Sequence, residues 1–370
     1  MSVKKYYNIH DLVHVEIKGN VAKAVFEQID FQINFFETEF KSTHQSTITV
    51  YPYEEWKNTE QKTSIYYDSN FISEKFVNNT KEKTIVTRDR NGFSIFTDTP
   101  ILINLFIQFV LYPKGYSFIH AGGVVDKLGN AIIFPGPGGV GKTAILGSLV
   151  QKKGYKLLGD DVFLLHKSGT VLPFPRPFIL KEYHRSVYPE VFSHLTVGKK
   201  KNTISRKVLK FLIRNAPFYH AASEWLKENG LYSRVLQSLP LHQDYVAAVP
   251  VTDIFGSDCI AEGVVEVAAA YYLERVNSDD FSVSPIDSRL LSDRMFSVIH
   301  DEWSENAREI LRYGATNLIS LPDYYKVTAE SIDSALAAVD NKLISIPKSA
   351  TPEALYQFYI DIEKKYESQK

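Results

Sequence analysis

Eight residues near the middle of the chain have the types and spacing of a phosphate-binding loop. Residues 136–143 read GPGGVGKT and match the pattern G-x-x-x-x-G-K-[ST]. Glycines allow successive backbone N–H groups to turn toward an anion. The lysine of this pattern, Lys142, can reach the β- and γ-phosphates of a nucleotide, and the hydroxyl of Thr143 can bind Mg²⁺. The segment therefore predicts binding of a nucleoside triphosphate together with Mg²⁺.

The residues on either side of this segment favour the order strand, loop, helix. Ala131–Pro135 is a short apolar run typical of a buried strand, and residues 144–152 have helical spacing and a basic end. A helix that begins here would direct the positive end of its dipole toward a bound anion. A glycine-rich turn that binds nothing is the competing interpretation, but it does not account for Lys142 followed by Thr143.

Two adjacent carboxylates follow the loop. Asp160 and Asp161 lie between a helix expected to end near Gly154 and a strand expected to begin near Val162, which places the pair at a strand start. One Asp could face Mg²⁺ while the other accepts a proton from a hydroxyl, if the backbone turns there. Metal support and a positioned base are what phosphoryl transfer to an alcohol needs. The sequence does not assign the two roles, and a solvated Asp pair in a turn is the competing interpretation.

Three further residues are candidates for the same chemistry. His120, between an apolar run and two glycines, could contact the γ-phosphate or assist the base near neutral pH. Arg176, among prolines in PFPRP, and Arg275, at the end of an apolar run, could neutralise the transferring phosphoryl group. The competing interpretations are a structural strand histidine, a surface arginine on a proline turn, and an arginine that pairs with Glu274 or caps the sheet.

The composition is ordinary for a soluble globular protein. The chain has 370 residues and a formal net charge of −1, which predicts about two domains and no electrostatic attraction to nucleic acid or to an anionic membrane. Cys259 is the only cysteine, which excludes an internal disulfide and a cysteine zinc site. The first residues lack a secretory apolar core, and the apolar stretch at 101–112 reads as a buried helix too short to span a bilayer. We expect a cytoplasmic protein without a nucleic-acid or membrane partner.

Runs of β-type residues separated by turn signals dominate the first quarter of the chain, so residues 1–98 are predicted to form a small β-rich N-terminal region. Its strands are expected at 13–17, 46–51, 64–67, 83–87 and 93–97. The α/β core is predicted over residues 99–182 and 246–325. Within it we expect a helix at 99–115 and strands at 117–125, 131–135, 162–166 and 264–273.

Two further segments are predicted to be helical. Residues 183–245 are polar, with candidate helices at 208–213 and 221–227, and contain a basic stretch from Lys199 to Lys210. This helical insertion is either a solvated or mobile segment, or a lid or docking site for an acidic partner. Helices are also expected at 288–312, 328–340 and 352–368, so that residues 326–370 would be C-terminal helices. Thr351 is the expected N-cap of the last helix, with Pro352 in its first position.

The stretch from IHAGG to GDDVFLL, about 50 residues around the loop, resembles the catalytic core of the HPr kinase/phosphorylase family. It is also similar to the wider phosphoenolpyruvate-carboxykinase-like group. The resemblance depends on a His-containing strand, the phosphate loop and the Asp-Asp pair, and it extends weakly through PFPRP and YYLER toward uncharacterised or peptide-modifying members. It implies an α/β fold with a P-loop nucleotide-binding core, to which this chain adds the β-rich N-terminal region and the helical insertion.

Carried onto this sequence, the resemblance implies a kinase that uses ATP and Mg²⁺. Thr143 and one of Asp160 and Asp161 would hold Mg²⁺, and the other Asp would be the general base. His120, Lys142 and Arg176 would act at the reacting phosphate. The residues expected to contact the nucleotide are Gly136, Gly138, Gly139, Val140, Gly141, Lys142, Thr143 and Ala144. Members of the family often form oligomers, so a homo-oligomer is expected from the resemblance alone.

One departure from the family narrows the expected reaction. The downstream E-x-R-G-x-G signature is missing, because the chain contains no Arg-Gly dipeptide, and this argues against the reverse phosphorylase reaction and against HPr as substrate. We expect a Mg-ATP-dependent kinase that transfers the γ-phosphoryl group to a serine-like hydroxyl of a peptide, protein or small metabolite. The alternative is a nucleotide-binding regulatory or assembly ATPase without an acceptor. Motifs of GTPases, ABC-type ATPases and helicases are missing.

Overall fold

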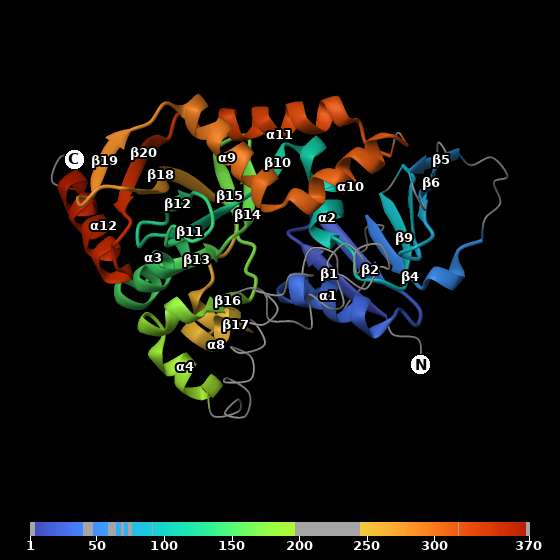
Figure 1. The fold of residues 1–370 in the computed structure, drawn as a ribbon, viewed down its shortest axis with the longest axis horizontal. Coiled ribbons are helices and arrows are strands. Elements are labelled where there is room, and N and C mark those ends of the chain that lie inside the picture. Colours follow the sequence, from blue (N-terminus) through green and yellow to red (C-terminus); the bar gives the residue numbers. More distant parts are fainter. Residues whose placement is uncertain are drawn as a thin grey trace, which may run out of the picture. The chain divides into compact units, whose positions relative to one another are not determined.

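The computed structural model describes residues 4–39, 47–57, 64–67, 70–72, 76–90, 92–196, 245–316 and 318–367 (Figure 1). It is a mixed α/β structure that divides into two compact units. The first unit comprises Met1–Pro177 and Phe255–Lys370, and the second comprises Phe178–Ile254. The helices predicted at 208–213 and 221–227 and the basic stretch from Lys199 lie outside the described residues.

A nine-stranded sheet forms the N-terminal part of the first unit, counted over the described residues. In sheet order its strands are β3 (Glu37–Thr38), β1 (Lys5–Ile9), β2 (Val13–Ile17), β4 (Ile48–Tyr51), β9 (Phe93–Thr97), β8 (Thr84–Arg88), β7 (Phe76–Asn79), β6 (Asn70–Ile72) and β5 (Ser64–Tyr67). The strands expected in this region are therefore present. Helix α1 (Lys23–Ile33) was not predicted, and it buries Val25, Ile29 and Ile33 at a spacing of four residues.

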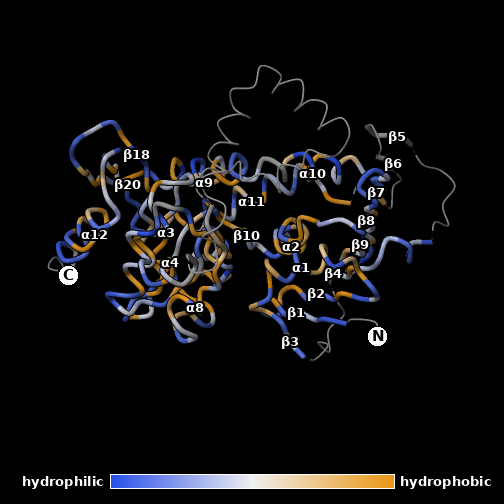
Figure 2. Tube along the Cα trace, turned by 60° about the horizontal axis from the view of Figure 1, so that its bottom comes forward, coloured by the Kyte–Doolittle hydropathy of each residue, from blue (hydrophilic) through white to orange (hydrophobic). Residues whose placement is uncertain are grey.

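Helix α2 (Ile103–Leu111) is buried on nearly all sides, as expected for the apolar stretch at 101–112. Figure 2 colours it as hydrophobic along its length. The ring of Phe106 lies 5.5 Å from that of Phe93 in β9 and 5.4 Å from that of Tyr313. The helix is apolar all round because the N-terminal sheet covers one side and C-terminal helices cover the other. One hydrophobic core therefore includes residues from both parts of the first unit.

A second sheet, with nine strands in the described part of the chain, carries the residues of the predicted site. Its strands are β10 (Tyr116–Ile119), β14 (Phe163–His166), β15 (Thr170–Leu172), β18 (Val265–Val276), β12 (Ala131–Pro135), β11 (Ala121–Val125) and β13 (Lys156–Gly159), with β20 (Asp340–Pro347) beside β18 and β19 (Ser282–Pro285) beside β20. β12 pairs antiparallel with β11 and parallel with β18, and β18 pairs parallel with β20. The strand that ends at the glycine-rich loop therefore lies inside the sheet.

Two predictions for this sheet were wrong in detail. The strand expected at 117–125 is two strands, because β10 pairs with β14 whereas β11 pairs with β12 and β13. His120 stands at the break between them. Residues 326–370 are not helical throughout, since β20 lies among them.

The helices of the first unit that follow the loop or lie near the C-terminus are α3 (Lys142–Ser148), α9 (Ser288–Glu302), α10 (Ser304–Gly314), α11 (Leu321–Leu336) and α12 (Pro352–Glu367). The helix expected at 288–312 is two helices, α9 and α10, because Trp303 leaves the helical conformation at φ −109° and ψ 43°. The predicted cap of α12 is present, since the amide N–H of Ala354 donates to Thr351 Oγ1 at 3.2 Å. Within the described residues, no helix combines the length and apolar character needed to cross a membrane.

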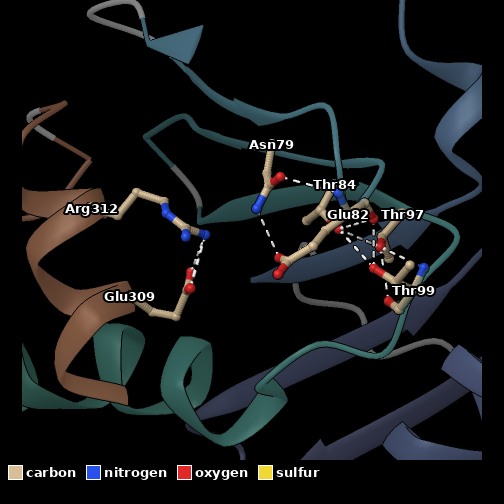
Figure 3. Close-up of polar contacts among 7 residues, drawn as sticks. All are labelled: Asn79, Glu82, Thr84, Thr97, Thr99, Glu309 and Arg312. Atoms are coloured by element: carbon tan, nitrogen blue, oxygen red, sulfur yellow. Dashed lines mark hydrogen bonds and ion pairs between the residues drawn. The ribbon is translucent and has the colours of Figure 1, made fainter. Parts of the chain in front are cut away.

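Polar side chains lie where α10 faces the N-terminal sheet (Figure 3). Arg312 is buried and its Nη1 donates to Glu309 Oε2 at 2.9 Å. On the sheet side, Asn79 Nδ2 donates to Glu82 Oε2 at 2.8 Å, and the hydroxyls of Thr84 and Thr97 are 2.8 Å apart. These contacts satisfy buried polar groups that would otherwise destabilise the packing.

The second unit is described in part. It contains β16 (Phe178–Lys181) and β17 (Tyr245–Val249), which pair antiparallel, the helix α4 (Pro189–Thr196), and all but the last residue of the helix α8 (Val251–Phe255).

Candidate functional site

The glycine-rich loop, residues 136–143, connects the end of β12 to the start of α3. Gly136 has φ 155°, and a Cβ atom there would lie 2.5 Å from the carbonyl oxygen of Leu273 in β18. Gly139 has φ 80°, and nothing lies within 4 Å of the position its Cβ would take. Side chains rarely adopt these backbone conformations, so glycine is needed at both positions. Val140 and Ala144, predicted to contact the nucleotide, are each only 3% exposed.

Lys142 lies beneath the loop with only 4% of its surface exposed. Its Nζ donates to the carbonyl oxygens of Gly136 at 2.7 Å and Pro137 at 2.9 Å. The same Nζ lies 3.1 Å from His120 Nε2. The predicted lysine and histidine are therefore in contact, although 22 positions separate them in the sequence.

Burial lowers the pKa of His120, and the charge of Lys142 lowers it further. The imidazole is therefore neutral near pH 7. Because the lysine ammonium can only donate, Nε2 accepts its hydrogen bond and the ring hydrogen is assigned to Nδ1. Nδ1 is buried and has no hydrogen-bond partner in the described part of the protein.

The Asp pair lies in the turn between β13 and β14, so it stands before a strand, as predicted, and directly after a strand that was not predicted. Thr143 Oγ1 is 2.9 Å from Oδ2 and 3.1 Å from Oδ1 of Asp160. Asp160 is 5% exposed, and burial, followed by the neighbouring charge of Asp161, raises its pKa. The hydrogen bond from Thr143 opposes this rise only in part.

Asp161 has a left-handed backbone conformation with φ 71°. A non-glycine residue in this region is uncommon and costs free energy, and such residues are found preferentially at functional sites. The carboxylate is close enough to affect the pKa values of His120, Asp160 and Arg176. The turn therefore separates the two carboxylates: Asp160 contacts the loop, and Asp161 is only partly buried.

Arg176 is held near these carboxylates by the proline-rich segment 173–177. Phe174 anchors that segment: its side chain is fully buried, its ring lies 4.9 Å from that of Phe118, and its N–H donates to Leu158 O at 2.8 Å. Burial lowers the pKa of Arg176, while Asp161 and Asp160 raise it. The buried Nε has no hydrogen-bond partner in the described structure.

The structure adds one residue that the sequence analysis missed. The N–H of Gly138, in the middle of the loop, donates to Glu302 Oε1 at 2.6 Å. Glu302 is the last residue of α9 and belongs to no recognisable motif, so no sequence signal connects it to the loop. Arg275 caps the end of β20, one of its two alternative roles, while Glu274 pairs with Arg294. The Nη1 of Arg275 donates to the carbonyl oxygens of Pro347, Lys348 and Ala350 at 2.9–3.3 Å.

The donor set fits a magnesium ion that is also bound by phosphates and water. No group of three or more His, Cys, Asp or Glu side chains in the described ranges could form a metal site by itself. Thr143 and Asp160 instead offer two hard oxygen ligands in contact with each other. Mg²⁺ commonly takes one or two carboxylates and completes its coordination with waters and substrate phosphates. A cation there would favour the ionised carboxylate of Asp160, whose pKa is raised by burial in the unliganded protein.

Comparison with known proteins adds no family assignment. No protein-family model matches the chain, and no curated protein is significantly similar to it.

Proposed function

We propose that this protein is a Mg-ATP-dependent kinase whose acceptor is a hydroxyl group of a peptide, protein or small metabolite. The observation that carries the proposal is the contact between Thr143 and Asp160. In this contact, the hydroxyl of Thr143, the last residue of the glycine-rich loop, donates to the carboxylate of Asp160, which directly follows β13. Lys142 and His120 lie beside the same loop. In this proposal the second sheet is a P-loop nucleotide-binding core of the HPr kinase and phosphoenolpyruvate-carboxykinase-like type.

The contacts favour different roles for the two aspartates. Asp160, buried and hydrogen-bonded to Thr143, is suited to hold Mg²⁺. Asp161 makes no such contact and keeps part of its surface exposed, so it is suited to accept the proton of an incoming hydroxyl. Mg-ATP would supply the transferable phosphoryl group and the counter-charge for its transfer.

The remaining polar residues position or neutralise charge. His120 is neutral in this state, so we assign it to holding Lys142 and not to donating a proton. Lys142 now donates to two loop carbonyls, and these bonds place its ammonium at the base of the loop. Arg176, close to both aspartates, is suited to stabilise negative charge that develops at the acceptor side.

The test is transfer of label from γ-labelled Mg-ATP to acceptors in cell extract. The variants are Asp160→Asn and Asp161→Asn, in which asparagine preserves side-chain size and tolerates the left-handed backbone at position 161. Asp333→Asn, on the exposed face of α11, is the matched control for loss of a carboxylate. We expect both site variants to lower label transfer about 100-fold or more, and the control to keep it.

The same experiment separates the kinase from the alternative of a regulatory or assembly ATPase. The alternative predicts release of labelled phosphate without any labelled acceptor. Label transfer that survives both site substitutions would contradict the assigned roles. Transfer that stops only with Asp161→Asn, with Mg-ATP binding intact, would be specific support for Asp161 as the base.

A further inference from the structure

The glycine-rich loop already holds an anion that belongs to the protein. The carboxylate of Glu302 accepts the N–H of Gly138 at 2.6 Å, a short distance typical of a charge-assisted hydrogen bond. A Cβ atom at position 138 would lie 2.9 Å from the same Oε1 atom, so the carboxylate lies close against the loop backbone. The charge of Glu302 also acts on His120 at the base of the loop.

The position of Glu302 in its own helix does not explain this arrangement. Glu302 is the C-terminal residue of α9, where the helix dipole is negative and a carboxylate is unfavourable. The following residue, Trp303, is not helical, so Glu302 stands at a break between α9 and α10. The hydrogen bond from the Gly138 N–H offsets the unfavourable location of the Glu302 carboxylate.

We propose that Glu302 is an affinity-determining residue of the nucleotide site, because its carboxylate occupies the loop amide that a nucleotide phosphate needs. This inference rests on the nucleotide-binding part of the proposed function. Two anions cannot share one N–H at close range, so a bound phosphate displaces the carboxylate. The side chain is exposed and lies at a helix end, so it can swing away without disturbing the core. Wild-type affinity for Mg-nucleotide is thus lower than the loop alone would give.

Three substitutions distinguish the effect of the Glu302–Gly138 contact on nucleotide affinity from the effect of net charge. Glu302→Gln removes the charge at constant size, and Glu302→Asp keeps the charge but shortens the side chain. Asp301→Asn removes one charge from the neighbouring, exposed position of the same helix end. Calorimetric titration with Mg-ATP and with Mg-ADP measures the affinity of each protein, and thermal unfolding checks that each is folded.

We expect Glu302→Gln and Glu302→Asp to tighten Mg-ATP binding roughly two- to fivefold, the range for an exposed ionic contact. Asp301→Asn should stay within the error of wild type. Unchanged or weaker binding by Glu302→Gln would overturn the inference, as would equal tightening by Asp301→Asn. If no protein of the set binds either nucleotide, the proposed function and the inference both fail. If all bind equally, only the inference fails.

Discussion

Two aspartates of the candidate site occupy environments that are unfavourable for an aspartate. Asp160 is almost fully buried beside a second carboxylate, with one hydroxyl as its hydrogen-bond partner among the contacts described above. Asp161 adopts a backbone conformation that costs free energy. Such arrangements persist when a ligand compensates for them or when chemistry needs them. We therefore expect these two residues to lower the stability of the unliganded protein.

Replacing Asp160 by asparagine tests this cost. Asp160→Asn keeps the side-chain volume and removes the carboxyl group whose pKa is raised by burial and by Asp161. Folding near neutral pH then no longer requires this group to take up a proton or to be buried as a charge. We expect the melting temperature of the ligand-free protein at pH 7.5 to rise by about 2 °C or more, because roughly 1 kcal/mol produces a shift of that size. Calorimetry of wild type and variant measures it. Asp333→Asn should leave the melting temperature unchanged, and a fall for Asp160→Asn would mean that its carboxylate stabilises the free protein.

Helices and strands next to the candidate site do not fill all the space between them. A small cavity with room for about one water molecule lies between α2, β10, α9, α10 and α11. Among its lining residues, Asn104, His300 and Thr328 each have a buried polar atom without a hydrogen-bond partner in the described structure. His300 lies two residues before Glu302, so this cavity adjoins the last turn of α9.

Substituting Thr328 tests whether its hydroxyl is truly unpaired. Thr328→Val keeps the shape and removes the hydroxyl, so we expect unfolding free energy to stay equal or rise by up to about 1 kcal/mol. Thr316→Val is the control, because the buried Thr316 Oγ1 donates to Tyr313 O at 2.8 Å and its loss should cost about 1 kcal/mol. Denaturant titration compares the two. An equal loss for Thr328→Val would indicate that a water molecule in the cavity binds the hydroxyl.

The segment that carries Arg176 is also tied to the N-terminal sheet. His10, in the turn between β1 and β2, places Nε2 2.7 Å from the carbonyl oxygen of Pro173. Burial lowers the pKa of His10, and the bond to Pro173 and the charge of Asp11 oppose this only in part. Folding therefore favours the neutral ring, so stability from this group is present above the unfolded pKa near 6.5 and is lost as pH falls below it.

His10→Asn provides the comparison, because asparagine accepts the left-handed conformation that His10 has at φ 52°. The variant loses the contact with Pro173 and should be less stable than wild type at pH 7.5. Between pH 7.5 and 5.5, wild type should lose more stability than His10→Asn, so the difference narrows. Unfolding free energies at several pH values measure this. A difference that widens toward pH 5.5 would show that the charged ring is preferred in the folded state.

Across the whole molecule, features encoded by neighbouring residues could be predicted from the sequence, whereas contacts between distant residues could not. The glycine-rich loop, its flanking strand and the Asp pair are each encoded within a few residues. β13 was missed because it has only four residues and begins with a lysine. β20 was missed because its first three residues are polar or charged, which weakens the periodicity. The break at His120 depends on which strands pair, and the contact of Glu302 joins positions 164 residues apart. Neither leaves a local signal.

The N-terminal sheet and the second sheet contribute residues to the same hydrophobic core, so we expect them to unfold cooperatively. Phe93 in β9 is 3% exposed and packs on Phe106 and Phe109 of α2, within one shared hydrophobic core. Phe93→Ala should cost about 3–5 kcal/mol, the range for a buried aromatic side chain. Leu128→Ala, at a position 85% exposed, is the control and should cost little.

Because the core is shared, we expect Phe93→Ala to lower the unfolding midpoint of both sheets together. Variants that retain only Trp56 or only Trp303 report the two parts separately. Trp56 contacts Phe76 and Phe96 of the N-terminal sheet, and the ring of Trp303 lies 6.4 Å from that of Phe118 in β10. Coincident fluorescence transitions in denaturant, shifted by the same amount, would support a single cooperative unit. A shift confined to Trp56 would mean that the N-terminal sheet unfolds alone, and that its mutations do not reach the nucleotide loop.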